Sequence, residues 1–313
     1  MKTIHVTYPL SLKKDCIPET VAAIGFFDGI HKGHQAVIKK AVKEAGKKKM
    51  ECAVITFHPH PSVVFSKDVA HVEYITPMPE KETILKELNI DRLYVITFNE
   101  QLAAMEPQAF IDHFIIGLNI KHVVAGFDFT YGQKDKANMN TIEEHSRGLF
   151  TYTTIDKVEI NNQKVSSTAI RNYLKEGRME EVNDLLTRPF VISGEVVRGA
   201  SRGHELGYPT ANIAVSADTL LPRKGIYAVK VHHGGKIYNG MASLGTNPTF
   251  TPDSHRLSLE VNILDFKGII YGEHLTIEWH RYIREELTFQ NTETLIEAIE
   301  KDEKAIRSYF GNH

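Results

Sequence analysis

Two histidines stand three residues apart at the end of the first strongly apolar run of the sequence. The run VAAIGF (21–26) leads into FFDGIHKGHQAVI, so His31 and His34 lie where a strand is expected to become a helix. Glycines let the backbone approach a phosphate closely, and the amides of a helix N-terminus attract anions. Imidazoles three residues apart lie on one side of a helix. The pattern predicts a phosphate site that includes Gly25, Asp28, His31 and His34.

A lone histidine at a helix start is more often a cap or a surface residue, but HxGH after an FDG turn is a more specific pattern. Further along the chain, Ser167, Thr168 and Arg171 lie in the segment VSSTAIR (165–171). The planar guanidinium group of Arg171 can donate two parallel hydrogen bonds to a phosphate. The hydroxyls of Ser167 and Thr168 are as well suited to capping a helix, and a cap leaves neighbouring amides available to an anion. Both roles are compatible.

A second candidate site lies in GEVVRGASRGHELGYPTANI (194–213). Its loop contains Gly199, Gly203 and Gly207, which would let the backbone fold over phosphates, although a glycine-rich loop alone is a weak signal. Thr210 and Asn212 are two apart on an extended segment and therefore point to one side. A hydroxyl and an amide oxygen there are suited to Mg²⁺ and ATP. The alternative is a plain glycine and proline turn.

Glu260 is the residue on which two arguments disagree. It lies in LEVNILDF (259–266), where Leu257, Leu259 and Val261 straddle it, so strand alternation alone predicts a solvent-facing side chain. A carboxylate is nevertheless suited to act as a base in phosphoryl transfer, which needs positioning and charge neutralisation more than covalent chemistry.

These motifs together resemble the bacterial bifunctional riboflavin kinase/FMN adenylyltransferase (FAD synthetase) family. HxGH, TFHPHP (56–61), GFDFTYG (126–132) and VSSTAIR are similar to the motifs of the FAD synthetase part, within the nucleotidylyltransferase superfamily. PTAN (209–212), MASLGTNPTF (241–250) and LEVNILDF resemble riboflavin kinase. The resemblance covers most of the chain. It implies phosphorylation of riboflavin to FMN and adenylylation of FMN to FAD, with ATP as co-substrate, Mg²⁺ as cofactor and pyrophosphate as a product.

The resemblance also implies roles for individual residues. His31 and His34 would contact the ATP phosphates, with Ser167, Thr168 and Arg171 closing on them. Pro59, His60 and Asp128 would lie on the flavin side, although Asp128 stands where many relatives carry Asn. Thr210 and Asn212 would hold Mg²⁺ and ATP in the kinase, and Glu260 would be its base. His204 departs from the basic residue that relatives often carry in the loop, and Trp279, Arg281 and Arg284 would border a ligand or lie on the barrel surface.

The elements that must position the first site form an alternating pattern. Four apolar runs predict strands at 21–26, 52–57, 92–98 and 121–127, and apolar residues at helical spacing predict crossover helices at 34–49, 79–89 and 107–118. Nearly continuous apolar strands indicate a parallel sheet covered on both faces. The expected fold is an α/β Rossmann-like nucleotidylyltransferase domain, whose ligands gather at the carboxyl ends of the strands.

From about residue 190 the pattern changes to short alternating runs with glycine-rich turns. Runs at 191–197, 225–233, 236–245, 256–266 and 274–283 predict a small antiparallel β-barrel, with Gly234 and Gly235 in a hairpin turn. A C-terminal helix should pack on it through Leu295, Ile299, Ile306 and Phe310. Two short helices separated by Gly177 precede the barrel. We place the domains at 1–187 and 188–313.

Composition limits the remaining possibilities. The chain has 313 residues and a net charge of −2, and so shows no sign of a surface for nucleic acid. It has no apolar run long enough for a membrane span and no secretory signal, which predicts a cytoplasmic protein. Cys16 and Cys52 are expected to be buried free thiols. The sequence does not indicate the oligomeric state. Three alternative functions also stay open: a nucleotidylyltransferase for another substrate, a non-catalytic flavin-binding protein, and a chain in which only one of the two domains is active.

Overall fold

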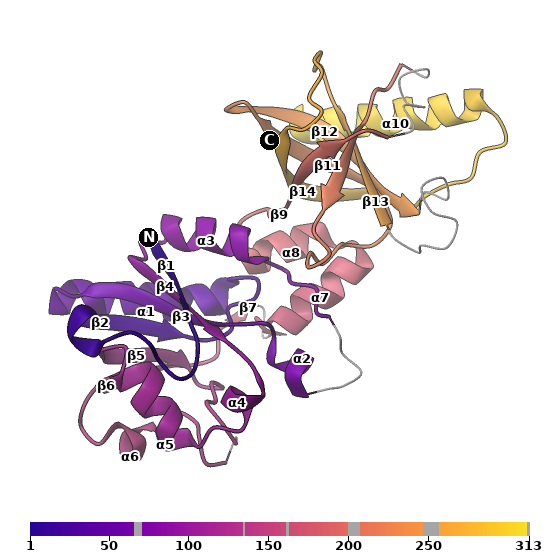
Figure 1. Cartoon of the computed structure of the whole chain (residues 1–313). Helices are drawn as coiled ribbons and strands as arrows, with labels where there is room; N and C mark the ends of the chain where they lie inside the picture. Colours follow the sequence, from indigo (N-terminus) through magenta and orange to yellow (C-terminus); the bar gives the residue numbers. More distant parts are fainter. Residues whose placement is uncertain (66–70, 134, 161–162, 200–206, 247–256, 312–313) are drawn as a thin grey trace. The chain divides into compact units, whose positions relative to one another are not determined.

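A computed structural model describes the chain except for residues 66–70, 134, 161–162, 200–206, 247–256 and 312–313 (Figure 1). Its contacts divide the described residues into two units, Met1–Ser167 and Thr168–His313. Gly203 and His204 of the predicted glycine-rich loop lie outside the described residues. The same holds for residues 247–250 of the segment that resembles riboflavin kinase.

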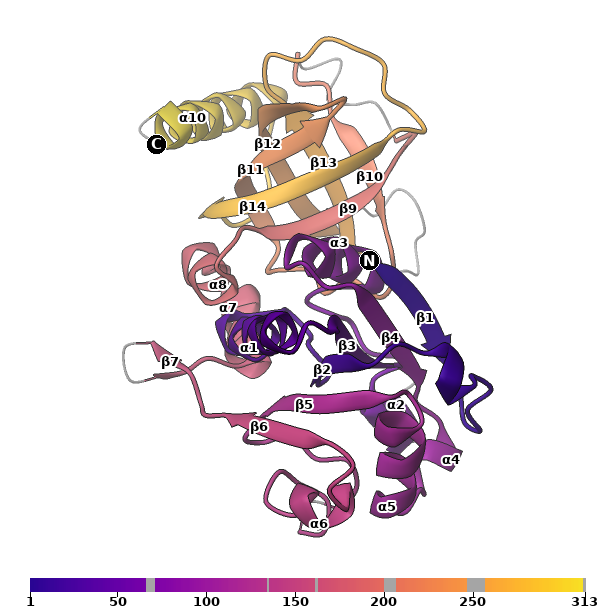
Figure 2. The ribbon, with the colours of Figure 1, turned by 90° about the vertical axis from the view of Figure 1, so that its left-hand side faces the viewer.

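The first unit contains a six-stranded parallel sheet with the strand order β1-β4-β3-β2-β5-β6 (Figure 2). The four predicted strands are confirmed, and β1 and β6 are additional. The strands are β1 (Lys2–Val6), β2 (Thr20–Ile24), β3 (Glu51–His58), β4 (Arg92–Thr97), β5 (Ile120–Gly126) and β6 (Thr151–Ile155). A separate small hairpin joins β7 (Glu159–Ile160) to β8 (Gln163–Lys164).

Helices cover both faces of this sheet, as the continuous apolar strands indicate. One core packs Val37, Ile38 and Leu85 against the sheet, and the other packs Phe110 and Phe114. The predicted helix at 107–118 is interrupted, because Gly117 donates its amide to the Asp112 carbonyl, five residues back, in a π-helical segment at Ile111–Ile116. The helices are α1 (Lys32–Lys48), α2 (Pro61–Phe65), α3 (Met78–Glu87), α4 (Glu100–Ala103), α5 (Pro107–Phe110) and α6 (Ile142–Ser146).

The strand order places a topological switch point beside β2. The chain runs from β2 to β3 and β4 on one side and then crosses to β5 on the other side of β2. Ligands of open α/β sheets bind outside the carboxyl ends of the strands at such a point. The loops after β2 and β5, which contain the FDG turn and the segment GFDFTYG, are therefore the loops expected to form a site.

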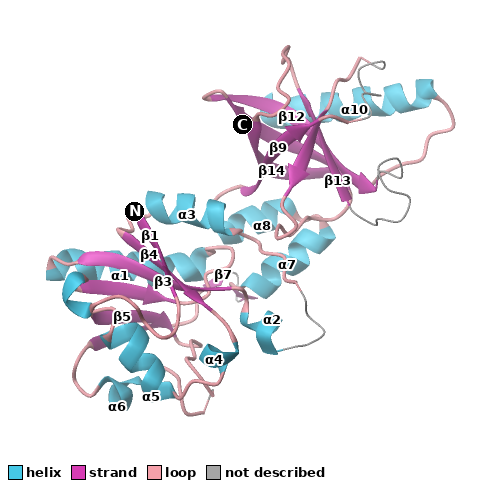
Figure 3. Cartoon of the chain, in the orientation of Figure 1, coloured by secondary structure: helices cyan, strands magenta, loops and turns pink. Residues whose placement is uncertain are grey.

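The second unit is dominated by a closed antiparallel barrel with the strand order β10-β13-β12-β11-β14-β9 (Figure 3). The five predicted runs are strands, and β10 forms where only an extended segment was expected. Gly234 and Gly235 have φ of 56° and 74°, which confirms the hairpin turn. The strands are β9 (Phe190–Val197), β10 (Ala211–Val215), β11 (Gly225–His233), β12 (Lys236–Thr246), β13 (Leu257–Ile263) and β14 (His274–Arg284).

Three longer helices complete the described part of the chain. These are α7 (Ser167–Glu176), α8 (Met179–Leu186) and α10 (Thr292–Gly311). Gly177 separates α7 from α8 with a φ of 77°, as its position predicts. The predicted face of α10 packs on the barrel through Ile299, Ile306 and Phe310, while Leu295 lines a cavity instead. Ile306 is fully buried against Ile226 and Met241 of the barrel, with Ile299 and Phe310 packed beside it.

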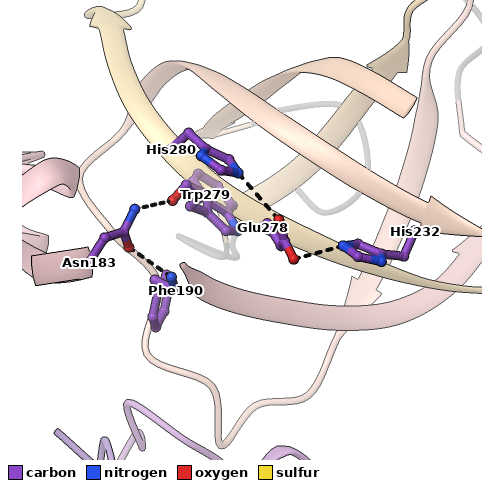
Figure 4. Close-up of polar contacts among 6 residues, drawn as sticks. All are labelled: Asn183, Phe190, His232, Glu278, Trp279 and His280. Carbon is purple, nitrogen blue, oxygen red and sulfur yellow. Dashed lines mark hydrogen bonds and ion pairs between the residues drawn. The ribbon is translucent and has the colours of Figure 1, made fainter. Parts of the chain in front are cut away.

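Asn183 ties α8 to the barrel (Figure 4). Its Nδ2 donates to the Trp279 carbonyl at 2.8 Å, and its Oδ1 accepts from the Phe190 amide at 2.8 Å. One side chain therefore satisfies backbone groups of β14 and β9. Such groups are costly to leave without partners inside a protein.

One expectation about the cysteines is wrong. Cys52 is buried in β3, but Cys16 is exposed because it lies in the short 3₁₀ turn Lys14–Cys16, outside the sheet. In the part of the chain that the structure describes, no helix combines the length and apolar character needed to cross a membrane.

Replacing Asn183 by alanine should destabilise the barrel by about 1–3 kcal/mol, since two half-buried backbone groups lose their partner. Trp279 is the only tryptophan of the chain and is fully buried in the barrel, so its fluorescence during urea unfolding reports this unit. The exposed neighbour Asp184 provides the control substitution Asp184→Ala. An unchanged midpoint for Asn183→Ala would show that water replaces both hydrogen bonds without cost.

Candidate active sites

The turn between β2 and α1 combines an unusual backbone with buried side chains. Phe27, Gly29 and Ile30 have φ of 52°, 92° and 42°, values that are uncommon for residues other than glycine. The side chains of Phe27 and Ile30 are almost completely buried, so packing holds this conformation. The turn ends at His31, which is the N-cap of α1.

The two histidines of HxGH contact each other directly. His31 Nδ1 accepts the His34 amide hydrogen at 3.2 Å, and the two rings stack with centroids 3.6 Å apart. Because Nδ1 accepts, neutral His31 carries its proton on Nε2. A Cβ at Gly33 would lie 3.2 Å from His31 Cε1, which explains why glycine suits the position between them.

His34 is held in the neutral form. Burial, with smaller contributions from His31 and Lys81, lowers the pKa of His34 well below its usual 6.5. Its Nδ1 is buried and has no hydrogen-bond partner within the described residues. An imidazole in this state donates a hydrogen bond to an anion without bringing a full charge into the site.

Asp28 and Ser167 are fixed beside the same turn. Asp28 is buried and its Oδ1 accepts the Thr76 amide hydrogen at 3.1 Å, while Ser167 Oγ donates to the Asp28 carbonyl at 2.8 Å. Thr168 and Arg171 follow on α7 and belong to the second unit. The role of these two residues toward phosphates stays a prediction.

The expected flavin side contains a cluster of rings after β3. The Phe26 ring meets the His60 ring edge to face at 4.4 Å and stacks on Tyr74 at 6.2 Å, and the His60 amide donates to Tyr74 Oη. Pro59 precedes His60 at the end of β3. Asp128 follows β5, is exposed, and forms an ion pair with Lys164 at 2.9 Å.

Lys81 is a buried residue beside the turn between β2 and α1 that the sequence pattern does not reveal. It lies on α3 with 2% of its surface exposed, and its Nζ donates to the Phe26 carbonyl at 3.0 Å. Burial lowers its pKa from 10.5 to about 8, while Asp28 acts in the opposite direction. The sequence MPEKETILKE offered only a helical pattern, in which any of several charged residues could face solvent.

In the barrel, the structure brings Glu260 and Thr210 together. Thr210 Oγ1 donates to Glu260 Oε2 at 3.2 Å, and Asn212 lies opposite Glu260 in the register between β10 and β13. A Cβ at Gly199 would lie 2.0 Å from Asn212 Nδ2, so this glycine makes room for the Asn212 side chain. Gly207 has a φ of 80°, which favours glycine.

Glu260 is half-buried in a cavity of about 310 Å³. Leu259 and Val261 point into the barrel core, so alternation correctly places Glu260 on the opposite face. That face is covered by α10 and the chain before it, which alternation along one strand does not reveal. The cavity is lined by residues that include Tyr208, Thr210, Met241, Asn262, Phe289, Leu295, Ile299 and Asp302.

Trp279, Arg281 and Arg284, which were expected near a ligand or on the barrel surface, lie in three different environments. Arg284 lines the cavity and forms a two-pronged ion pair with the buried Asp302 of α10. Arg281 pairs with Glu180 of α8, away from the cavity lining. Trp279 is fully buried against Tyr227, so neither expectation holds for it.

Family models match both parts of the chain, that for FAD synthetase at residues 13–169 and that for riboflavin kinase at residues 186–310. The fold and sites therefore define a two-domain enzyme with a nucleotidylyltransferase sheet and a flavokinase barrel. The bifunctional riboflavin kinase/FMN adenylyltransferase of Listeria monocytogenes is 45% identical over 310 residues, 99% of this chain and 98% of that protein. That of Bacillus subtilis is 42% identical over 313 residues, covering 100% and 99%. The chain belongs to the bifunctional riboflavin kinase/FMN adenylyltransferase family.

A solved structure extends the likeness to the whole fold. A crystal structure from Streptococcus pneumoniae, named as a macrolide-efflux protein, has a TM-score of 0.88 and 33% sequence identity. It covers 98% of this chain, and this chain covers 99% of it. Both parts of the present fold therefore occur together in an experimentally determined structure.

His34 should remain neutral at pH 6.5, where an ordinary histidine is half-protonated. The unfolded chain binds this proton at the usual pKa and the folded chain does not, so the free energy of unfolding should fall as the pH drops below 6.5. Histidine ring NMR during a pH titration measures this, with His34→Gln to assign the signal and the exposed His5 as reference. Half-protonation of His34 at or above pH 6.5 would contradict the assignment.

Proposed function

We propose that this chain phosphorylates riboflavin to FMN in the barrel and adenylylates FMN to FAD at the parallel sheet, with Mg-ATP as donor in both reactions. The observation that carries the proposal is that each unit holds its own site: the stacked His31 and His34 in the first, and Glu260 with Thr210 in the second. We assign residues 1–187 to the adenylyltransferase and 188–313 to the kinase.

In adenylylation, a phosphate oxygen of FMN attacks the α-phosphorus of ATP, and the bond to the leaving pyrophosphate breaks. Negative charge that develops on the phosphate oxygens needs donors fixed in advance. His31 supplies its Nε2 hydrogen, His34 supplies a neutral imidazole, and the N-terminal amides of α1 add their dipoles. Gly25, Asp28 and Ser167 shape the turn, and Thr168 and Arg171 complete the ATP site. Pro59, His60 and Asp128 contribute to the flavin side.

In phosphorylation, Glu260 accepts the proton of the riboflavin 5'-hydroxyl as its oxygen attacks the γ-phosphorus, and ADP leaves. The Thr210 hydroxyl and the Asn212 amide oxygen would hold Mg²⁺, which favours oxygen ligands, and both lie beside Glu260. Bound Mg²⁺ supplies neutralisation of the triphosphate charge. Gly199 and Gly207, with Gly203, belong to the ATP loop.

The cavity beside Glu260 is the place we propose for riboflavin. Its volume of about 310 Å³ lies at the lower end of the roughly 300–1,000 Å³ typical of small-molecule sites. Leu295, Ile299 and Phe289 give it an apolar wall for a flat ring system, and Glu260 and Thr210 give it a polar end. This combination orients a hydroxyl-bearing chain toward the carboxylate.

Alternative functions explain fewer of the motifs and domains of this chain. A nucleotidylyltransferase for another substrate would use HxGH but would have no need of the barrel. A non-catalytic flavin-binding protein would have no need to keep His31, His34, Thr210, Asn212 and Glu260, and all five are present. We further propose small molecules rather than nucleic acid as partners, and the cytoplasm, where ATP is available, as the location.

Replacing His31 by alanine should stop FAD formation while FMN accumulates, because His31 belongs only to the adenylylation site. Loss of a fixed donor costs about 10²- to 10³-fold in kcat. Separation of riboflavin, FMN and FAD by chromatography during incubation with riboflavin and Mg-ATP measures both steps. His5→Ala, at an exposed histidine, is the control. Loss of FMN formation in folded His31→Ala protein would contradict the division of labour.

Glu260→Gln keeps the size and most hydrogen bonding of the side chain but removes the proton acceptor. Riboflavin phosphorylation should fall by roughly 10² to 10⁴, mainly in kcat, since a positioned base typically contributes that factor. Conversion of supplied FMN to FAD should stay normal. Glu293→Gln, at an exposed position of α10, is the matched control. A decrease in phosphorylation of less than about tenfold would mean that Glu260 is not the base.

A further inference from the structure

Lys81 is a buried cation that the proposed reaction does not yet use. Its side chain enters the first unit from the first turns of α3 and is 2% exposed. Within the described residues, its hydrogen bonds go to the Phe26 carbonyl at 3.0 Å and to Thr56 Oγ1 at 3.5 Å, and no carboxylate lies within ion-pair distance. A buried charge whose partners are neutral is expensive and is concentrated at functional sites.

The carbonyl that Lys81 binds belongs to the turn that carries the histidines. Thr56 Oγ1 also donates to the Phe26 carbonyl, at 2.9 Å, so two donors from α3 and β3 converge on one oxygen. Phe26 is followed by the left-handed residues Phe27, Gly29 and Ile30 and then by His31. When the Phe26 carbonyl is held in place, the start of this turn is held as well, and the buried side chains of Phe27 and Ile30 restrict the rest of its backbone.

The same lysine also contacts the flavin side through Phe26. Its Nζ lies 5.2 Å from the centroid of the Phe26 ring, whose edge-to-face partner is His60. The backbone of Phe26 thus leads to the phosphate side and its ring to the flavin side. Movement of this residue would disturb the alignment of the two substrates.

Lys81 acts on the phosphate side through its charge as well. Its positive charge contributes to the lowered pKa of His34, and Asp28 partly offsets the effect of burial on Lys81 itself. In a buried environment a charge is screened less than in water. A buried cation near the turn therefore favours neutral His34 and would favour the negative charge of a bound triphosphate.

We propose that Lys81 is a positioning residue for adenylyl transfer, which fixes the Phe26 carbonyl and places a buried positive charge at the start of the turn that carries His31 and His34. The proposal rests on the adenylyltransferase function assigned above to this site. It predicts a loss of turnover, rather than of FMN affinity, when the charge is removed.

Two neutral variants separate the charge from the hydrogen bond. Lys81→Met removes both, while Lys81→Gln keeps a donor for the Phe26 carbonyl. We expect both to lower kcat for conversion of FMN to FAD by about tenfold to a hundredfold, with the KM for FMN within about threefold of wild type. Lys81→Arg, which keeps the charge, should retain more activity than either. Lys86→Met removes an exposed lysine of the same helix and should change nothing.

The pKa of His34, measured by histidine NMR, gives a readout that a purely structural role would not move. It should rise in Lys81→Met and Lys81→Gln and stay near its wild-type value in Lys81→Arg and Lys86→Met. The titratable residues of the turn, Asp28 and His31, are unchanged in all four variants. Riboflavin phosphorylation in the same samples serves as an internal control, because it belongs to the barrel.

The outcomes separate this proposal from the function on which it rests. If the wild-type chain does not convert FMN to FAD, the proposed function fails. If the wild type is active and the folded neutral variants keep adenylylation within about threefold, or lose it with the His34 pKa unmoved, Lys81 is not a positioning residue. If Lys81→Met does not fold, Lys81→Gln decides. If neither neutral variant folds, Lys81 serves folding alone and the proposal is overturned.

Discussion

The hydrogen bond from the His34 amide to His31 Nδ1 is the interaction on which the arrangement of the proposed adenylylation site depends. It caps α1, sets the proton of neutral His31 on Nε2 and brings the two imidazoles into a stack. The turn before it is strained, because Phe27 and Ile30 adopt left-handed conformations that cost about 1–3 kcal/mol each. Burial of both side chains in the sheet core offsets this cost. The site is thus held by the same packing that forms the fold.

In the barrel, Glu260 is positioned in a different way. Strand alternation places Glu260 on the outer face, and a second element, α10, covers that face and turns it into a cavity wall. The ion pair between Arg284 and the buried Asp302 connects β14 to α10 at the cavity. The proposed base therefore lies on a strand, and the C-terminal helix supplies part of its environment.

Local pattern was sufficient to predict most of the fold. Apolar runs gave the four central strands and the barrel strands, and glycines at Gly177, Gly234 and Gly235 gave the turns. Short-range signals failed where tertiary context decides. The edge strand β1 is formed by pairing with β4, and the exposure of Cys16 follows from its place outside the sheet. Nothing in the sequence around Trp279 distinguished a core residue from a ligand contact.

For the candidate sites, too, local patterns predict some residues and tertiary contacts decide the others. HxGH and PTAN are short motifs, so the sequence could predict that His31 and His34 lie together at a helix start and that Thr210 lies beside a strand, while their chemical roles stay predictions. Lys81 and the partner of Asp128, Lys164, are brought to their places by contacts across 55 and 36 residues of sequence, which no single-chain pattern reveals. For Glu260, strand alternation predicted the correct face of β13 but could not show that α10 covers this face. Burial, which decides the chemistry of all these groups, is a property of the fold.

One chain is expected to carry two successive ATP-dependent reactions on flavin. The direct measurement is a time course of the wild-type protein with riboflavin and Mg-ATP, in which riboflavin, FMN and FAD are separated and quantified. FMN should appear first and FAD should follow, with ADP and pyrophosphate released in the respective steps. Failure of riboflavin to become FMN, or of supplied FMN to become FAD, would contradict this expectation.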